Sequence, residues 1–312
     1  MGSSQIAGSP PDRPAASRMT GHLTFETWDV FTDRRFAGNP LAVVFRADGL
    51  SAEAMQAIAA EFDYSETVFL CRPEADDADA RVRIFTPTGE LPFAGHPTVG
   101  AACALARADG RRGALLLELG AGRFPVRLSI GDACYAEFEN PNPPRCSGTA
   151  PDAGQIECAL SLPEGRVDRE AFAPVRAGAG IDFIYARTDA AALDAARLDF
   201  AAWDAMALDG VCGVYLYAED RPGPSTFDAR MFGPHIGVPE DPATGSAAAG
   251  LPAHRLAAGA LPDGQHEWTV EQGRVMGRPS RIFVRLSVQG GRCVGLRVGG
   301  HAVPFMKGEL EA

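Results

Sequence analysis

The chain has 312 residues, of which 46% are hydrophobic and 22% charged, as in an ordinary globular protein with a full core. Its formal net charge of -11 argues against nucleic acid as a partner, because nucleic-acid phosphates require a basic face. The sequence has no run of about 18 apolar residues, so it predicts no membrane-spanning helix.

The seven cysteines are scattered, form no C-x-x-C pair and have no histidine at zinc-finger spacing. We therefore expect neither a disulfide framework nor a structural metal, and a reducing cytoplasm is the simpler interpretation. Residues 1–20 are rich in Ser, Pro, Gly and Ala and lack an apolar signal core, which indicates a disordered leader or tag. Met19 is a candidate native start beside Met1.

The first half of the chain alternates strand-like segments with two helical segments. Ser51 is the expected N-cap of a helix over 52–62, and an almost entirely apolar stretch predicts a buried helix over 97–108 that ends at Gly110. Runs of β-branched and aromatic residues bounded by Gly, Pro or Asp predict strands at 23–30, 42–45, 67–71, 80–85, 114–119 and 124–130.

The second half repeats this order, with an Ala-rich helix over 246–258 that Pro252 is expected to kink or break. Strands are predicted at 183–186, 211–217, 229–232, 267–272, 282–288 and 293–298. We therefore predict an α+β fold of two similar lobes, each a mostly antiparallel sheet wrapped around a central helix. The Pro-rich stretch at 140–150 separates an N-terminal lobe (21–145) from a C-terminal lobe (146–312), with strand exchange at the chain ends as an option.

Both predicted central helices begin at a Gly turn, and these starts carry the first functional signal. A helix N-terminus presents unpaired N–H groups and the positive end of the helix dipole, so two such starts facing one pocket would suit a small carboxylate. His96 follows Gly95, where it could either cap the backbone or donate to a substrate oxygen. At the second start, Asp241, Thr244, Gly245 and Ser246 form either an N-cap cluster or a ligand site.

Glu66 is the candidate for proton transfer. It precedes an apolar strand, where it is either an exposed strand-edge residue or a partly desolvated acid and base. Ser246 is interpreted as a ligand-binding hydroxyl, because the loop lacks both the lysine of a P-loop and the pattern of a nucleophile elbow.

Taken together, these segments resemble the phenazine-biosynthesis (PhzF-like) isomerase family. The resemblance extends over about residues 24 to 300, and its motifs lie at 36–43, 65–67, 85–87, 90–97, 240–248 and 277–280. It implies a diaminopimelate-epimerase-like fold of two pseudo-symmetric lobes, a homodimer, and a site without cofactor or metal. The reaction best known for the family is the isomerisation of trans-2,3-dihydro-3-hydroxyanthranilate.

The resemblance also implies roles for single residues. Glu66 would be the acid and base that moves a proton between carbons, assisted by His96 and Asp241. A small cyclic amino acid would be bound by the residues that match the remaining positions, namely Asn39, Gly95, Thr244, Gly245 and Ser246.

Two alternatives stay open. An amino-acid or hydroxy-acid epimerase or racemase would need a second base, His96 or Asp241, because neither helix start carries the cysteine that related racemases use and Cys103 lies further along its helix. The other alternative is a non-catalytic metabolite-binding protein of the same fold. The sequence does not identify the substrate, and 131–180 and 221–225 show no motif.

Overall fold

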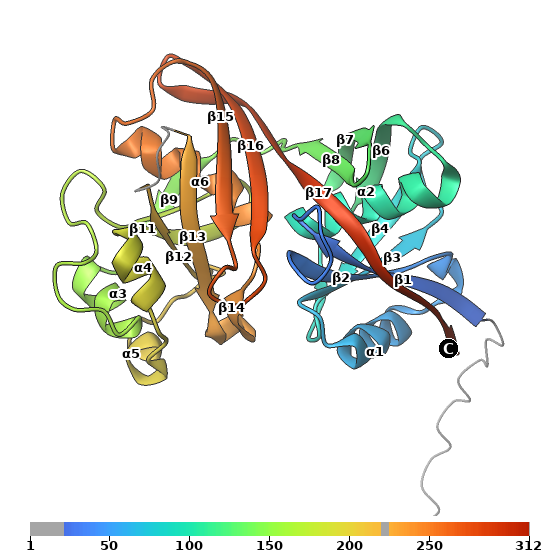
Figure 1. The fold of residues 1–312 in the computed structure, drawn as a ribbon, viewed down its shortest axis with the longest axis horizontal. Coiled ribbons are helices and arrows are strands. Elements are labelled where there is room, and N and C mark those ends of the chain that lie inside the picture. Colours follow the sequence, from blue (N-terminus) through green and yellow to red (C-terminus); the bar gives the residue numbers. More distant parts are fainter. Residues whose placement is uncertain (1–21, 220–224, 312) are drawn as a thin grey trace, which may run out of the picture.

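The computed structural model describes residues 22–219 and 225–311 of the chain (Figure 1). Its helices are α1 (Ala52–Phe62), α2 (Gly95–Asp109), α3 (Ala153–Ala159), α4 (Ala190–Ala195), α5 (Phe200–Ala205) and α6 (Gly245–Ala257). The strands up to residue 139 are β1 (His22–Val30), β2 (Asn39–Val44), β3 (Glu66–Cys71), β4 (Ala80–Phe85), β5 (Glu90–Leu91), β6 (Gly113–Leu119), β7 (Gly122–Ile130) and β8 (Cys134–Glu139). The later strands are β9 (Arg145–Gly148), β10 (Val175–Gly178), β11 (Asp182–Arg187), β12 (Val214–Ala218), β13 (Thr226–Gly233), β14 (Val238–Asp241), β15 (Gly264–Gln272), β16 (Ser280–Gln289) and β17 (Arg292–Glu311).

The strands form one mixed sheet in which most neighbours are antiparallel. Within the described ranges, the parallel pairs are β2 with β3, β4 with β6, β11 with β12, and β13 with β15. The last strand connects distant parts of the chain, since β17 pairs with β16 through its first residues and with β1 through its last ones. In Figure 1, β17 accordingly runs from the part that holds α6 to the part that holds α2.

Both central helices are enclosed by strands, which explains their apolar sequences. Helix α2 is buried along nearly its whole length and packs against strands that include β1, β2, β7 and β8. Helix α6 packs against a different set that includes β9, β10, β11 and β16. Because both helices are buried except at their C-terminal ends, small residues such as Ala and Gly allow the strands to approach closely.

Many predicted elements are confirmed. Ser51 caps α1 by accepting a bond from the amide of Ala54, and Gly110 ends α2 in the left-handed conformation. Each strand predicted in the first half is present, with bounds that differ by at most a few residues.

Other expectations are wrong or incomplete. Helix α6 is not broken at Pro252, because the surrounding strands hold the helix on both sides of the proline. The last predicted strand, 293–298, is only the beginning of β17, since Gly299, Gly300 and Pro304 interrupt the β pattern in sequence but not the pairing. The segment 131–180, which showed no motif, supplies β8, β9, α3 and β10, whereas 221–224 lie outside the described residues.

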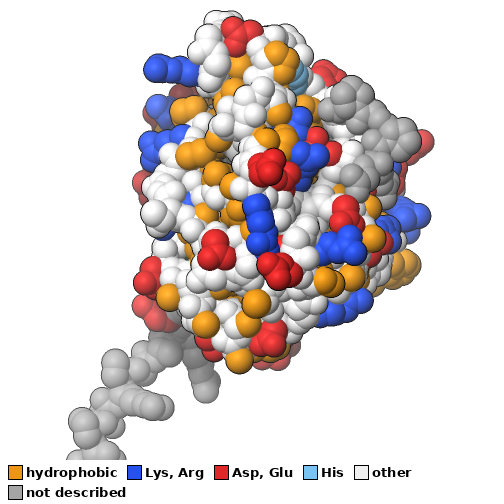
Figure 2. Space-filling view, turned by 90° about the vertical axis from the view of Figure 1, so that its left-hand side faces the viewer, with side chains coloured by type: hydrophobic (Ala, Val, Ile, Leu, Met, Phe, Trp, Pro, Cys, Tyr) orange, Lys and Arg blue, Asp and Glu red, His pale blue; other side chains and the backbone are white. Residues whose placement is uncertain are grey.

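The surface shows how the excess of acidic residues is accommodated. Figure 2 shows one face on which acidic and basic side chains are intermixed, with apolar ones among them. Some of the exposed charges form ion pairs. Nη1 of Arg166 lies 3.2 Å from Oδ2 of Asp189, and Nη1 of Arg187 lies 3.7 Å from Oδ2 of Asp168. Among the described residues, no helix is long and apolar enough to cross a membrane.

Candidate active site

The two Gly-turn helix starts touch each other. A Cβ added to Gly95 would lie 3.1 Å from the backbone nitrogen of Ser246 and 3.2 Å from Cα of Gly245. The starts of α2 and α6 are therefore in backbone contact, at a distance that only glycine permits at position 95. The fold thus brings together two motifs that lie about 150 residues apart in the sequence.

The first turns of both helices lack side-chain caps. Neither Ala94, the N-cap of α2, nor Thr244, the N-cap of α6, caps its helix with its side chain. The amides of Thr98 and Ala248 donate to the carbonyls of the N-cap residues Ala94 and Thr244. The N–H groups that precede these amides in each helix have no acceptor in the described part of the chain. The N-cap interpretation of the 241–246 cluster is therefore wrong for this structure.

Glu66 faces His96 beside these helix starts. Glu66 opens β3, its side chain is 16% exposed, and its Oε2 lies 3.5 Å from Nε2 of His96, which is 4% exposed. Both of these atoms are buried without a hydrogen-bond partner in the described ranges. A buried carboxylate and a buried imidazole that both lack partners are uncommon in a folded protein and indicate a place for a ligand.

Burial moves the pKa values of these two groups in opposite directions. Desolvation raises the pKa of Glu66 to about 7, partly offset by the hydroxyl of Ser65. Desolvation also lowers the pKa of His96 to about 4, against the charge of Asp241 and a bond with the carbonyl of Pro40. The carboxyl group can therefore exchange a proton near neutral pH while the imidazole stays uncharged.

Asn39 connects the groups of the two helix starts. It is fully buried at the beginning of β2, which runs parallel to β3, so its side chain lies near Glu66 and its neighbours. Its Nδ2 lies 3.3 Å from Nδ1 of His96 and donates to Oδ1 of Asp241 at 2.9 Å and to the carbonyl of Ala243 at 3.0 Å. Its Oδ1 accepts from the hydroxyl of Ser65 at 3.2 Å.

A second network holds Asp241 and Thr244. The hydroxyl of Thr244 donates to Oδ2 of Asp241 at 2.6 Å and accepts from Nε2 of Gln272 at 2.9 Å. Nε2 of Gln272 also donates to the carbonyl of Asp241 at 2.8 Å, and Oε1 of Gln272 accepts from the amide of Thr244 at 3.2 Å and from the hydroxyl of Tyr215 at 3.3 Å. The Thr244 hydroxyl is thus used within the protein.

The environment of Asp241 leaves it a proton acceptor of moderate strength. Burial raises its pKa to about 6, and the negative charge of Glu66 adds to this, whereas the bonds from Thr244 and Asn39 work in the opposite direction. Two carboxyl groups that influence each other titrate as a pair, so one proton held between them is favoured near neutral pH.

The structure brings every predicted site residue into one region, where Ser246 is partly exposed and its hydroxyl makes no hydrogen bond within the part of the chain that the structure describes. Sequence reasoning missed Gln272 and Tyr215, which lie in strands outside any motif. The fold brings Gln272 into contact with Thr244, and Tyr215 into contact with Gln272. The described residues contain no group of three or more His, Cys, Asp or Glu side chains placed to hold a metal ion.

Comparison with known proteins identifies the family. Residues 28–308 match the family described as phenazine biosynthesis-like protein. The chain is 42% identical to an uncharacterized isomerase from Mesorhizobium japonicum, over 91% of this chain and 97% of the relative. It is 35% identical to trans-2,3-dihydro-3-hydroxyanthranilate isomerase from Pseudomonas aeruginosa, over 90% of this chain and 96% of that enzyme. The chain therefore belongs to the phenazine biosynthesis-like family, as the sequence motifs predicted.

Solved structures agree on the fold. The phenazine biosynthesis protein of the PhzF family from Bacillus anthracis superposes with a TM-score of 0.82 at 23% identity, covering 93% of this chain and 99% of that one. A hydroxyproline epimerase from Agrobacterium vitis superposes with a TM-score of 0.65 at 13% identity, covering 95% of this chain and 92% of that one. The fold is thus shared between PhzF-family proteins and an epimerase.

Proposed function

We propose that the protein is a cofactor-independent isomerase that moves a proton between carbons of a small carboxylated substrate. The observation that carries this proposal is the pair formed by Glu66 and His96, whose facing atoms lie 3.5 Å apart, are buried and have no other partner in the described chain. Relatives named isomerases, among them one that acts on trans-2,3-dihydro-3-hydroxyanthranilate, support the same reaction class.

Glu66 acts as the single acid and base of the proposed reaction. With a pKa of about 7, its carboxylate can take a proton from an sp3 carbon and its acid form can return the proton to another carbon. Both transfers take place on one face of the substrate, so a second base on the opposite face is not required. His96 and Asp241 bind the amino or hydroxyl groups beside the reacting carbons and share the proton.

The helix starts bind the negative charge. The free N–H groups of the first turns of α2 and α6, with the Ser246 hydroxyl, are placed to receive a carboxylate and the charge that develops on the substrate. A cyclic amino acid resembling trans-2,3-dihydro-3-hydroxyanthranilate, the substrate named for one relative, is the proposed substrate class.

We further propose two pseudo-symmetric α+β lobes, over 21–145 and 146–312, in a cytoplasmic homodimer that binds neither nucleic acid nor membrane. The enclosure of α2 and α6 by different sets of strands supports the two lobes. Exposed apolar side chains at Phe36, Phe305 and Met306 support self-association, because an isolated apolar patch favours burial. Light scattering of the purified protein measures the mass that tests the dimer.

The decisive experiment follows deuterium uptake from solvent into a panel of small carboxylated metabolites that includes dihydro-hydroxyanthranilate. The native protein should exchange one carbon-bound hydrogen, and Glu66→Gln should lower the rate by about 10³, the usual range for losing a general acid and base. The exposed Glu61 supplies a matched control, and Glu61→Gln should exchange at the native rate.

Other outcomes decide between the alternatives. Undiminished exchange in Glu66→Gln would remove this residue from the mechanism. Deuterium at a stereocentre with inverted configuration would favour an epimerase, with His96 or Asp241 as the second base. Binding of carboxylates without any exchange would favour a metabolite-binding protein.

A further inference from the structure

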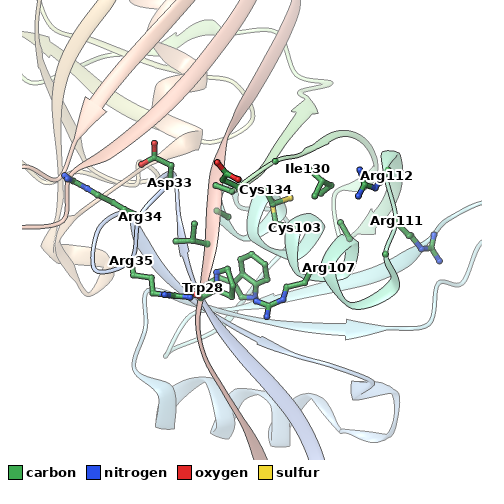
Figure 3. Close-up of a pocket in the computed structure, with 18 of the residues that line it drawn as sticks. Trp28, Asp33, Arg34, Arg35, Cys103, Arg107, Arg111, Arg112, Ile130 and Cys134 are labelled. Carbon is green, nitrogen blue, oxygen red and sulfur yellow. The ribbon is translucent and has the colours of Figure 1, made fainter.

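Two cysteines lie against each other outside the candidate active site. Cys103, in α2, is fully buried, and Cys134, the first residue of β8, is partly buried. Each thiol influences the pKa of the other. Figure 3 shows the two sulfur atoms side by side, with Cys103 reaching from the helix and Cys134 from the strand.

A hollow gives solvent access to this pair. Its volume is about 840 Å³, and both cysteines line it together with Trp28, Arg107 and Ile130. The lining includes five arginines but only two aspartates. The arginines are Arg34, Arg35, Arg107, Arg111 and Arg112, and the aspartates are Asp33 and Asp132. The lining is therefore locally basic in a chain of net charge -11, although Arg111 is already paired with Asp79 and Asp109.

The other cysteines are placed differently. Cys146 and Cys158 are exposed, yet no second thiol contacts either of them in the described part of the chain. Cys71 and Cys293 bond to backbone carbonyl groups instead. Cys212 is partly buried, and no cysteine is among the groups that shift its pKa. Among the residues described, only Cys103 and Cys134 therefore lie side by side at a hollow that both line.

We propose that Cys103 and Cys134 form a modification site, at which a hydroperoxide converts the two thiols into a reversible disulfide bond. The side-by-side position of the two sulfur atoms and the hollow at which Cys134 is partly exposed carry this inference, and it does not depend on the proposed isomerase activity.

The chemistry takes place in two balanced steps. The Cys134 thiolate attacks the hydroperoxide, so that an S–O bond forms, the O–O bond breaks, and water or an alcohol leaves. The Cys103 sulfur then attacks the resulting sulfenic acid, forming the S–S bond and releasing water. The two thiols supply the two electrons that reduce the peroxide.

The surroundings assign the two roles. The neighbouring Cys103 thiol lowers the pKa of Cys134, whereas burial raises the pKa of Cys103. Cys134, which is also the more exposed of the two, is therefore the attacking thiol, and Cys103 is the resolving thiol.

The test treats the reduced full-length protein with hydrogen peroxide at low concentration, alkylates the remaining thiols and identifies linked peptides by mass spectrometry without reduction. We expect a Cys103–Cys134 linkage, and the free thiols should fall from seven to five, because one bond consumes two thiols. Dithiothreitol should restore all seven. The oxidised protein should also melt at a higher temperature, because the bond closes a loop of about 30 residues.

The variants separate this site from general oxidation. Cys146→Ser, which removes an exposed thiol without a thiol partner, should still form the bond. Cys134→Ser should abolish the disulfide bond, and this partly exposed position should tolerate the change. Cys103→Ala, which removes the other thiol, should also abolish the bond. Disulfides confined to other cysteines, or irreversible oxidation of Cys134 with Cys103 still free, would overturn the proposal.

Discussion

The two helix starts that meet at the candidate active site are held in different ways. The start of α6 is fixed by side chains, since Thr244 bonds to both Asp241 and Gln272, and Gln272 bonds in turn to Tyr215. At the start of α2, His96 contacts Asn39 through Nδ1, but its Nε2 faces Glu66 without a hydrogen bond in the described chain.

This difference suggests that the two helix starts have different roles. The polar groups at the start of α6 bond to one another and therefore hold Asp241 in a fixed position. The side with α2 and β3 leaves two titratable groups buried and unsatisfied, which lowers stability but keeps them available for a substrate. Asn39 joins the two sides by contacting both His96 and Asp241.

Among the changes that test the comparison of the two helix starts, the largest effect is expected where the starts touch. In Gly95→Ala, the new methyl group would lie 3.1 Å from the nitrogen of Ser246 and 3.2 Å from two backbone atoms of Gly245, so the backbone must move. Because a displacement of about 1 Å in a catalytic site can cost 10²-fold in rate, we expect about a 100-fold loss in the deuterium-exchange assay.

Gly89→Ala is the matched control for this change. A Cβ at Gly89 meets no atom within 4 Å, and its φ lies outside the left-handed region, so exchange should stay at the native rate. Equal rates for Gly95→Ala and the native protein would show that contact between the helix starts does not matter for the reaction.

The contrast between the two starts also explains how far sequence reasoning extends. The motifs at 93–97 and 240–246 identified both starts, because a glycine turn before an apolar helix leaves a local signature. Gln272 has no such signature, because its contacts with Asp241 and Thr244 arise from the position of β15 in the sheet. Burial of Glu66 likewise depends on the neighbouring strands, so the residues alone favoured an exposed position at the strand edge.

The long last strand was missed for a related reason. Pro304 and Phe305 lie at a register shift between β1 and β17, where Thr27 pairs with Met306 and Trp28 with Pro304. Such a bulge tolerates a proline that would normally end a strand, and only the partner strand reveals it.

The next effect concerns how the stability of the protein depends on pH through Glu66, which lies beside the start of α2. The unfolded chain releases the Glu66 proton near the ordinary pKa of 4.5, whereas the folded protein keeps it until about pH 7. Between these values the folded protein binds more protons, so Glu66 makes stability fall as the pH rises. We expect Glu66→Gln to unfold at a higher urea concentration than the native protein at pH 8, with a gain of about 3 kcal/mol that shrinks toward pH 4.

Glu61→Gln, at an exposed position, should show no such pH-dependent gain. The contribution of His96 has the opposite sign, since its lowered pKa makes stability rise with pH, but it is present in both proteins and is removed by the subtraction. A difference between native protein and Glu66→Gln that does not change from pH 4 to pH 8 would contradict the raised pKa of Glu66.

The smallest effect is expected from removing a hydrogen bond at the start of α6. Thr244→Val removes the hydroxyl that donates to Asp241 at 2.6 Å, so the pKa of Asp241 should rise above its value of about 6. If the ionised form of Asp241 assists the reaction, as proposed, the acid limb of the pH–rate profile should move upward by roughly half to one unit. Thr244→Ser keeps the hydroxyl and should keep the native profile.

Gln272→Leu tests whether the support is relayed through Thr244. Its amide orients the Thr244 hydroxyl by donating to it at 2.9 Å but does not bond to the carboxylate of Asp241, so its removal should shift the acid limb in the same direction by a smaller amount. In the double variant Thr244→Val with Gln272→Leu, the shift should equal that of Thr244→Val alone, because the glutamine has no donor left to orient. Additive shifts would mean that Gln272 acts on Asp241 through the backbone carbonyl, and the relay through Thr244 would be excluded.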